Sequence, residues 1–224
     1  MRRSSMPVGR CFAGAVTFQG QVYVLGGYLY KDDCQRVSAE ISRYNPAVDK
    51  WYAVTSMNCA REGLCACVLE ENIYAIGGCD PDGNYLTTVE QYEPLLDRWN
   101  KVSPMLKKRA FASAAVVNSQ ILVIGGRESK QDSGILSCCE MLDPVTGQWT
   151  LQPSRLNAAR CAAGVCTFAD KVFVFGGEGE DEALNTVECW DDEKRQWSIV
   201  THLPFSASHV QAEVLCLPKT LMKS

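Results

Sequence analysis

Cysteine and histidine are the side chains through which this sequence could bind a metal ion or supply a nucleophile and a base. The 224 residues include twelve cysteines but only two histidines, His202 and His209. Neither Cys65-x-Cys67 nor Cys138-Cys139 has the C-x-x-C spacing of a zinc site. A Ser–His–Asp triad would have to use one of the two histidines, both near the end of the chain. The sequence therefore predicts no metal, no cofactor and no enzymatic activity.

Charge and hydropathy exclude two further kinds of partner. The formal net charge is −4, so the chain lacks the positive charge that neutralises a phosphate backbone, and we expect no nucleic-acid partner. No apolar run approaches the roughly 18 residues of a membrane span. The basic start, MRRSSMPVGR, is followed by no apolar segment of a secretory signal. Twelve cysteines without such a signal indicate reduced thiols, and we expect a cytoplasmic location and no membrane partner.

The elements that position these side chains follow a repeat of about 50 residues. An arginine lies 16 residues before the first glycine of each of four double glycines, and a tryptophan recurs once per unit. Nine residues before three of the tryptophans stands a glutamate, which Ser42 replaces in the first unit. The repeated residues are Arg10, Gly26, Gly27, Trp51, Arg61, Gly77, Gly78, Glu90, Trp99, Arg109, Gly125, Gly126, Glu140, Trp149, Arg160, Gly176, Gly177, Glu188 and Trp197. Such regularity predicts a repeat architecture.

Each unit is predicted to contain four short strands. After the arginine come segments of small and apolar residues such as FAGAVTF and FASAAVV, then a polar turn, then runs such as VYVLGG and ILVIGG. A stretch of variable length leads into a third strand, and the fourth begins at the tryptophan. Four strands in a period of about 50 residues indicate a blade of an all-β propeller.

The combination of arginine, double glycine, a Tyr-x-Pro-like turn and a following tryptophan resembles the kelch repeat, and the chain is similar to the propeller of the kelch-like (BTB–BACK–kelch) proteins. The resemblance extends from Arg10 to about Thr201. It implies a single kelch propeller domain over residues 1–224, with units at about 10–56, 57–104, 105–155 and 156–203.

The repeated residues are expected to build the scaffold. The glycines allow a turn without a Cβ atom, with positive φ and close packing between blades. The tryptophans fill the space between neighbouring blades. The arginine and glutamate of each unit suggest a buried ion pair, for which the loss of one partner would cost about 3–5 kcal/mol.

Most cysteines are expected to be small packing residues. Cys65 and Cys67 occupy inward positions of a first strand, where other units carry glycine, alanine, serine or valine. Cys34 and Cys79 stand in variable segments, so they are the better candidates for redox-sensing thiols.

Recognition is expected in the variable loops, because the repeated positions build the scaffold. The resemblance implies a binding face made by residues just after the glycines and two after each arginine. Tyr, Phe and Arg are favoured at binding hot spots, and Arg127 could bind a carboxylate of a partner. Glu178 opens the acidic segment EGEDEAL of the last unit. The candidate partner-binding residues are Phe12, Tyr28, Tyr30, Tyr85, Phe111, Arg127 and Glu178.

The resemblance implies a protein-interaction module that selects substrates for a cullin-based ubiquitin ligase. The BTB and BACK regions that bind the cullin are absent from these residues, so the chain itself would hold only the substrate. An actin-associated kelch protein is the alternative. A copper enzyme like galactose oxidase, which also has kelch-type blades, is the least favoured reading, because both histidines lie outside the repeats.

The last segment repeats the start of a unit. HVQAEVLCL falls in the register of FAGAVTF, and residues 208–218 are predicted to form a closing strand. In the kelch-like family such a strand joins the first blade, whose other strands are not found here. We therefore expect an incomplete ring and a fragment or truncated form of a longer protein. A four-blade ring with this strand displaced outward is the alternative.

Overall fold

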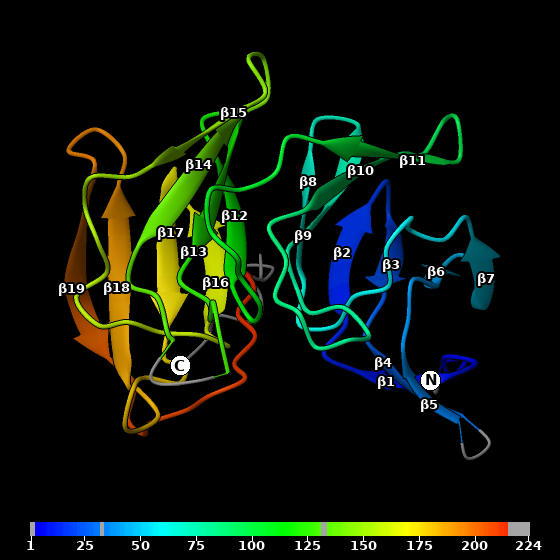
Figure 1. The fold of residues 1–224 in the computed structure, drawn as a ribbon, viewed down its shortest axis with the longest axis horizontal. Coiled ribbons are helices and arrows are strands. Elements are labelled where there is room, and N and C mark those ends of the chain that lie inside the picture. Colours follow the sequence, from blue (N-terminus) through cyan, green and yellow to red (C-terminus); the bar gives the residue numbers. More distant parts are fainter. Residues whose placement is uncertain (1–2, 32–33, 131–133, 215–224) are drawn as a thin grey trace, which may run out of the picture.

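The computed structural model describes residues 3–31, 34–130 and 134–214. These residues form strands and no helix, and most strands belong to four antiparallel sheets of four strands each (Figure 1). The all-β prediction is therefore confirmed, and each sheet is one blade of a propeller. In the described part of the chain no helix is long and apolar enough to cross a bilayer.

The four blades share one strand order, from the innermost to the outermost strand. Blade 1 contains β2 (Gly14–Phe18), β3 (Gln21–Leu25), β6 (Ile41–Asn45) and β7 (Lys50–Val54). Blade 2 contains β8 (Cys65–Leu69), β9 (Asn72–Ile76), β10 (Val89–Glu93) and β11 (Arg98–Val102). Blade 3 contains β12 (Ser113–Val117), β13 (Gln120–Ile124), β14 (Cys139–Asp143) and β15 (Gln148–Leu151). Blade 4 contains β16 (Gly164–Phe168), β17 (Lys171–Phe175), β18 (Thr186–Asp191) and β19 (Gln196–His202).

Tight hairpins connect the first two strands of the blades. Gln19 and Gly20 both have positive φ, as do Asn118 and Ser119 in blade 3. Positive φ at both central residues is the turn geometry that matches the right-handed twist of paired strands. The polar turn residues of the sequence therefore set the register in which β2 pairs with β3 and β12 pairs with β13.

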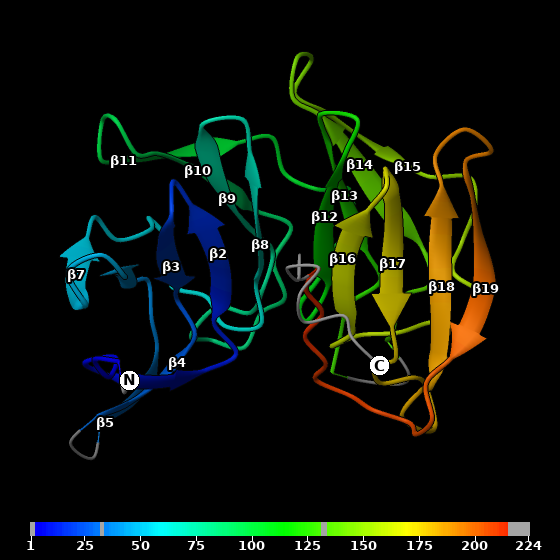
Figure 2. The same ribbon diagram turned by 180° about the vertical axis from the view of Figure 1, so that it is seen from behind.

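The blades stack through three apolar clusters, one at each boundary between neighbouring blades. Strand β2 packs against β8, β8 against β12, and β12 against β16. These innermost strands lie toward the middle of the molecule, while β7 and β19 lie at opposite edges (Figures 1 and 2). Among the described residues no comparable packing joins β2 to β16, so the ring is open between blade 1 and blade 4. The prediction of an incomplete ring is confirmed.

Buried arginine–glutamate pairs tie together the strands of blades 2, 3 and 4. The ion pairs join Arg61 to Glu90 at 2.8 Å, Arg109 to Glu140 at 3.0 Å, and Arg160 to Glu188. Each arginine also donates to the carbonyl of the first glycine of its unit. Each glutamate accepts two backbone N–H groups from the segment that precedes its arginine. The pairs are thus embedded in hydrogen bonds, which offset the cost of burying the charges.

Blade 1 lacks this ion pair because Ser42 stands in place of the glutamate. Arg10 donates instead to the carbonyls of Gly26 and Glu40 and to the Ser42 hydroxyl. Its guanidinium is partly buried, and desolvation lowers the pKa of Arg10. The first unit therefore holds its arginine by neutral acceptors alone among the described residues.

The double glycines lie where one blade touches the next. Gly77 has a φ of +61°, and a Cβ atom there would lie 2.3 Å from the carbonyl oxygen of Arg109 in the following unit. The next glycine, Gly78, donates its N–H to that same carbonyl at 2.8 Å. Both a positive φ and a close approach of two backbones thus require glycine at this position.

The tryptophans pack within and between blades. The rings of Tyr92 and Trp99 stack with centroids 5.0 Å apart, and those of Trp190 and Trp197 lie 5.4 Å apart. The Trp99 indole N–H also donates to the carbonyl of Thr55 in the preceding unit. These side chains therefore join the outer part of one blade to the end of the blade before it.

A small additional sheet was not foreseen from the sequence. Strands β1 (Gly9–Cys11), β4 (Tyr28–Lys31) and β5 (Cys34–Val37) form three antiparallel strands below blade 1 in Figure 1. The segment after the first double glycine, read as a variable loop, is thus a hairpin. Its alternation of aromatic, aliphatic and polar residues is a strand pattern that the length of the variable segment concealed.

The C-terminal segment follows the geometry of a unit start. The Ala207 carbonyl accepts the N–H of Gly177, as the Arg61 carbonyl accepts the N–H of Gly27. His209 has a φ of +54°, close to the +55° of Phe12. Residues 208–214 lie beside β16 but belong to no sheet of the described chain, and residues 215–218 of the predicted closing strand lie outside the described residues.

Candidate functional site

Five segments meet at one end of the central channel and form its mouth. The residue two positions after each repeated arginine, and its counterpart near the C-terminus, all have φ between +50° and +59°. We call them the mouth residues: Phe12, Gly63, Phe111, Ala162 and His209. Residues of five different segments are thus brought to the same level of the propeller.

Backbone hydrogen bonds join the mouth residues into a continuous chain. The N–H of Gly63 donates to the carbonyl of Phe12 at 2.8 Å, and that of Phe111 donates to Gly63 at 2.7 Å. The N–H of Ala162 donates to Phe111, and the N–H of Val210 donates to Ala162. Because each bond joins two neighbouring segments, the mouth is a fixed part of the scaffold rather than a set of independent loops.

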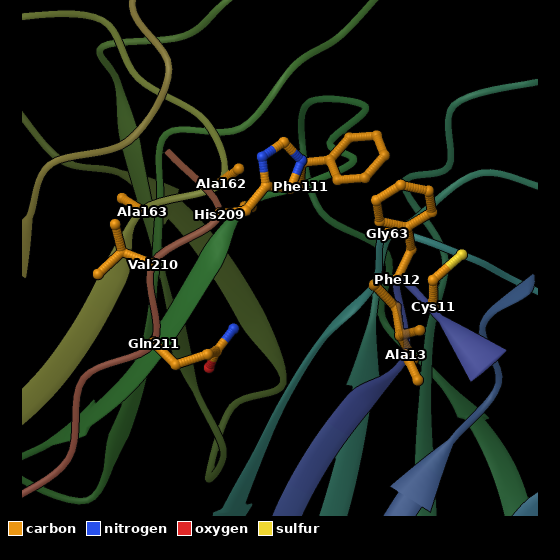
Figure 3. Close-up of a pocket in the computed structure, with 12 residues that line it drawn as sticks. Cys11, Phe12, Ala13, Gly63, Phe111, Ala162, Ala163, His209, Val210 and Gln211 are labelled. Atoms are coloured by element: carbon orange, nitrogen blue, oxygen red, sulfur yellow. The ribbon is translucent and has the colours of Figure 1, made fainter. Parts of the chain in front are cut away.

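Three aromatic rings gather at the mouth. The Phe12 and Phe111 rings lie edge to face with centroids 5.4 Å apart, and His209 lies 6.0 Å from Phe12 and 6.5 Å from Phe111. Figure 3 shows the three rings close together above the strands. Below them is a cavity of about 340 Å³, lined mainly by small and apolar residues such as Ala13, Leu64 and Ala163, and also by Gln211. The arrangement offers an apolar, aromatic surface that opens to solvent.

The backbone of the two phenylalanines is strained. A positive φ costs an L-residue with a Cβ atom roughly 1–2 kcal/mol, and bulky residues seldom adopt it. Gly63 occupies the same position in blade 2 without that cost. A Cβ atom on Gly63 would lie 3.0 Å from the Phe111 ring, so glycine there leaves space for that ring. The chain thus carries strain at the two positions that place aromatic rings at the mouth.

A second ring of residues surrounds the mouth. Each residue that follows a double glycine pairs with the residue after a repeated arginine. These pairs are Cys11 with Tyr28, Glu62 with Cys79, Ala110 with Arg127, and Cys161 with Glu178. The structure therefore brings the predicted residues Tyr28, Arg127 and Glu178 to the same end of the propeller as Phe12 and Phe111.

The two tyrosines predicted for partner binding lie on strand β4. The Tyr30 ring is 53% exposed and packs against the half-buried Tyr28 ring, with centroids 5.4 Å apart. The Cys11 thiol lies 3.8 Å from the Tyr30 hydroxyl, and this contact raises the Tyr30 pKa. Tyr28 and Tyr30 therefore form an aromatic surface beside Phe12, which is itself 45% exposed.

Arg127 is already engaged by a carboxylate of its own chain. Its guanidinium lies 3.8 Å from Glu178, and both side chains are partly exposed. The sequence pointed to Arg127 as a group that could bind a carboxylate of a partner. In the structure that position is shared with Glu178 of the neighbouring unit, so the pair is nearly neutral.

Two of the residues singled out from the sequence, Tyr85 and Cys79, are buried rather than exposed. Tyr85, expected as an exposed loop aromatic, is buried against Cys79 and Ala110. Cys79, expected in an accessible loop, is 4% exposed, and burial raises its thiol pKa, which disfavours a redox-active thiolate. The loop after Gly78 folds back on itself, with the Asp80 N–H donating to the Asn84 carbonyl at 3.0 Å. The side chain of Cys34 lies outside the described part of the structure.

Acidic side chains lie next to the mouth and in the β17–β18 loop. Glu62 stands next to Gly63, and desolvation raises the pKa of its carboxyl group, while the charge of Lys130 opposes that shift. The loop after β17 adds three exposed carboxylates, Glu180, Asp181 and Glu182. The positive charge of Lys107 is engaged by Glu128 at 3.1 Å. Glu62 and the three carboxylates of the β17–β18 loop are therefore the acidic groups available to a partner near this end of the propeller.

The two histidines occupy different parts of the fold. His202 lies on the outermost strand of blade 4, and His209 lies at the mouth. Among the described residues no group of three or more His, Cys, Asp or Glu side chains is placed to hold a metal ion.

His209 was missing from the candidates predicted from sequence. It lies 98 residues after Phe111 and outside the four units, so no local pattern joins the two. The alignment of HVQAEVLCL with FAGAVTF placed His209 in the register of Phe12 and was the signal that could have found it.

Comparisons with known proteins agree with this architecture. A family model described as the Attractin/LZTR1 β-propeller matches residues 1–193. Kelch-like protein 7 of Rattus norvegicus is 44% identical over 198 residues, covering 86% of this chain and 32% of that protein. Beta-scruin of Limulus polyphemus is 29% identical over 212 residues, covering 92% of this chain and 18% of that protein.

A solved structure shares the fold. The chain titled "Structure of YjhT" superposes with a TM-score of 0.82 at 14% identity, covering 92% of this chain and 75% of that one. At this identity the likeness concerns the fold alone. The present chain spans about a third of the length of Kelch-like protein 7.

Proposed function

Because the chain belongs to the Attractin/LZTR1 β-propeller family and is similar to Kelch-like protein 7 over most of its length, we propose that it is a non-enzymatic protein-interaction module. The partner binds at the mouth, on the surface formed by Phe12, Phe111 and His209. The proposal rests above all on one observation: two phenylalanines are held in a strained backbone conformation, where they project beside an apolar cavity.

The other features of the mouth support this role. Exposed aromatic side chains on a rigid frame lose little conformational entropy on binding, and they are the residue types that dominate binding hot spots. Tyr28 and Tyr30 extend the aromatic surface, and Arg127 and Glu178 provide a polar rim. A surface with an apolar centre and a polar rim is the usual anatomy of a protein interface.

We further propose that the partner is a substrate of a cullin-based ubiquitin ligase. Kelch-like propellers hold the substrate while BTB and BACK regions bind the cullin, and the chain would perform the first of these two tasks. The described cysteines are free thiols, which fits a reducing compartment such as the cytoplasm.

The test is proximity labelling in cells with the full chain fused to a biotin ligase. We compare the wild type with a Phe12→Ala/Phe111→Ala variant, and use Phe168→Ala as the control because Phe168 is an exposed phenylalanine at the far end of β16. We expect a set of labelled proteins that disappears only in the double variant and that binds the purified chain directly. An identical labelled set for all three proteins would contradict a binding role for the mouth.

A further inference from the structure

We infer that the mouth binds a linear peptide segment in which an aromatic or long aliphatic residue is flanked by lysine or arginine. The inference rests on the proposed function and names the chemistry of the partner at the same site. Its elements are the cavity between Phe12, Phe111 and His209 (Figure 3), the carboxylate of Glu62 next to Gly63, and the exposed carboxylates of the loop after Glu178.

The cavity fits an apolar anchor. Its volume of about 340 Å³ lies at the low end of ligand pockets, which suits a single large side chain better than an extended ligand. The Phe12 and Phe111 rings are perpendicular, so one of them can meet an inserted ring edge to face while the other stacks on it. Below the rings the wall is formed by small side chains such as Ala13, Ala112 and Ala163, with no charged group among the lining residues.

The strain at the mouth is evidence for a ligand-binding role of these rings. Phe12, Phe111 and Ala162 occupy a position at which glycine, present in blade 2, is free of the same backbone cost. The phenylalanines do not fill the core, because Phe12 is 45% exposed and Phe111 is partly exposed. The rings make only partial packing contacts, with each other and, for Phe111, with Cys79, Tyr85 and Ala110, so part of each aromatic surface remains open to a partner.

The carboxylates at this end of the propeller favour a basic partner. Glu62 directly precedes Gly63 at the rim, and Glu180, Asp181 and Glu182 follow Glu178 in the loop of blade 4. Three cations already interact with acidic side chains: Arg127 pairs with Glu178, Lys107 pairs with Glu128, and Lys130 acts on Glu62. Lys108 and Arg155, in the linkers between blades, are exposed. A basic residue beside the anchor would gain from these carboxylates, whereas an acidic segment would be repelled. The same carboxylates disfavour a nucleic acid.

The experiment is selection from a library of random seven-residue peptides displayed on phage, with the full chain immobilised. Selection on the wild type is followed by subtraction of peptides that also bind the Phe12→Ala/Phe111→Ala variant. We expect the remaining peptides to share an aromatic, leucine or methionine residue with lysine or arginine within two positions. Consensus peptides are then synthesised, and their affinity is measured by fluorescence polarisation.

Matched variants separate the two halves of the inference. Phe111→Ala should weaken the consensus peptide at least tenfold, and Phe168→Ala should leave it unchanged. A Glu62→Gln/Glu180→Gln/Glu182→Gln variant should weaken it severalfold and reduce its salt dependence, while Glu193→Gln, in the β18–β19 turn, should have no effect. Circular dichroism melting of each variant establishes that it is folded.

Two results would overturn the inference. Enriched peptides that are acidic or that lack an apolar anchor would contradict the proposed chemistry, and so would the recovery of no peptide sensitive to the double variant. If proximity labelling still depends on Phe12 and Phe111 in that case, the interaction function stands and only the partner chemistry is wrong. If the labelling is also insensitive to these residues, both proposals fail.

Discussion

The side chain of Arg109 donates from Nε to the carboxylate of Glu140 at 3.0 Å, and both side chains are completely buried. Glu140 also accepts the N–H groups of Leu106 and Lys107, which lie in the linker between blades 2 and 3. One ion pair thus fixes the backbone that leads from one blade into the next. Equivalent ion pairs in blades 2 and 4 hold the corresponding linkers in the same way.

Removal of the Glu140 carboxylate should destabilise the chain severely. Glu140→Ala leaves the Arg109 charge and two backbone N–H groups buried without their acceptor. We expect a loss of about 3–5 kcal/mol in the free energy of unfolding, measured by urea denaturation. Glu193→Ala, an exposed glutamate of blade 4, should change it by less than about 0.5 kcal/mol. Similar values for the two variants would show that the buried pair does not stabilise the fold.

Introducing the missing carboxylate should stabilise blade 1. In Ser42→Glu the new side chain can pair with Arg10, as Glu90 pairs with Arg61. We expect a gain of about 0.5–1.5 kcal/mol, observed as a higher melting temperature. The gain should vanish in an Arg10→Gln background, where the partner charge is absent. A gain of equal size in both backgrounds would argue against pairing.

Substitution of Gly77 should destabilise the fold by more than the cost of placing a non-glycine residue at a positive φ. In Gly77→Ala the new methyl group would lie 2.3 Å from the Arg109 carbonyl oxygen. Gly20→Ala is the matched control, because Gly20 also has a positive φ but a Cβ atom there meets nothing within 4 Å. We expect a loss of about 1 kcal/mol for the control. The loss in the free energy of unfolding should be at least twice as large for Gly77→Ala, and its melting temperature should fall correspondingly further.

Buried thiols should be unreactive near neutral pH. Burial, followed by the charge of Glu178, raises the pKa of Cys161 from 9.0 to about 11. Burial raises that of Cys139 to about 12. Alkylation by iodoacetamide at pH 8, followed by mass spectrometry, should therefore leave both residues unmodified in the folded chain and modify both in urea. Rapid modification in the native state would show that these strands open readily.

The same shift predicts a pH limit for stability. The folded state holds the Cys161 proton more tightly than the unfolded state does. The contribution of this thiol to the free energy of unfolding is therefore complete below pH 9. It is lost as the pH rises from 9 toward 11. Melting curves between pH 8 and 11 should show a decline that is smaller in Cys161→Ala than in the wild type. An equal decline in both would assign the effect to other groups.

Local pattern was sufficient for the blades. The small residues of FASAAVV and the run ILVIGG specify β12 and β13, because a strand with one face toward each neighbouring blade needs side chains of that size. The period was sufficient for the architecture, since markers that recur about every 50 residues place equivalent strands in equivalent blades. The period also predicted the arginine–glutamate pairs. In blade 2, for example, Arg61 and Glu90 lie 29 residues apart in the sequence.

Only the tertiary structure decided what the mouth contains. Phe12, Phe111 and His209 come from distant segments of the sequence. Their rings are in contact because the blades are arranged around a common axis. The burial of Tyr85 and the pairing of Arg127 with Glu178 likewise depend on how loops of different units lie against each other. The sequence by itself determines the strands and turns of each blade, because these depend on residues that are neighbours along the chain. Exposure and charge at the mouth are set by neighbours in space, and these exist only once the blades are stacked.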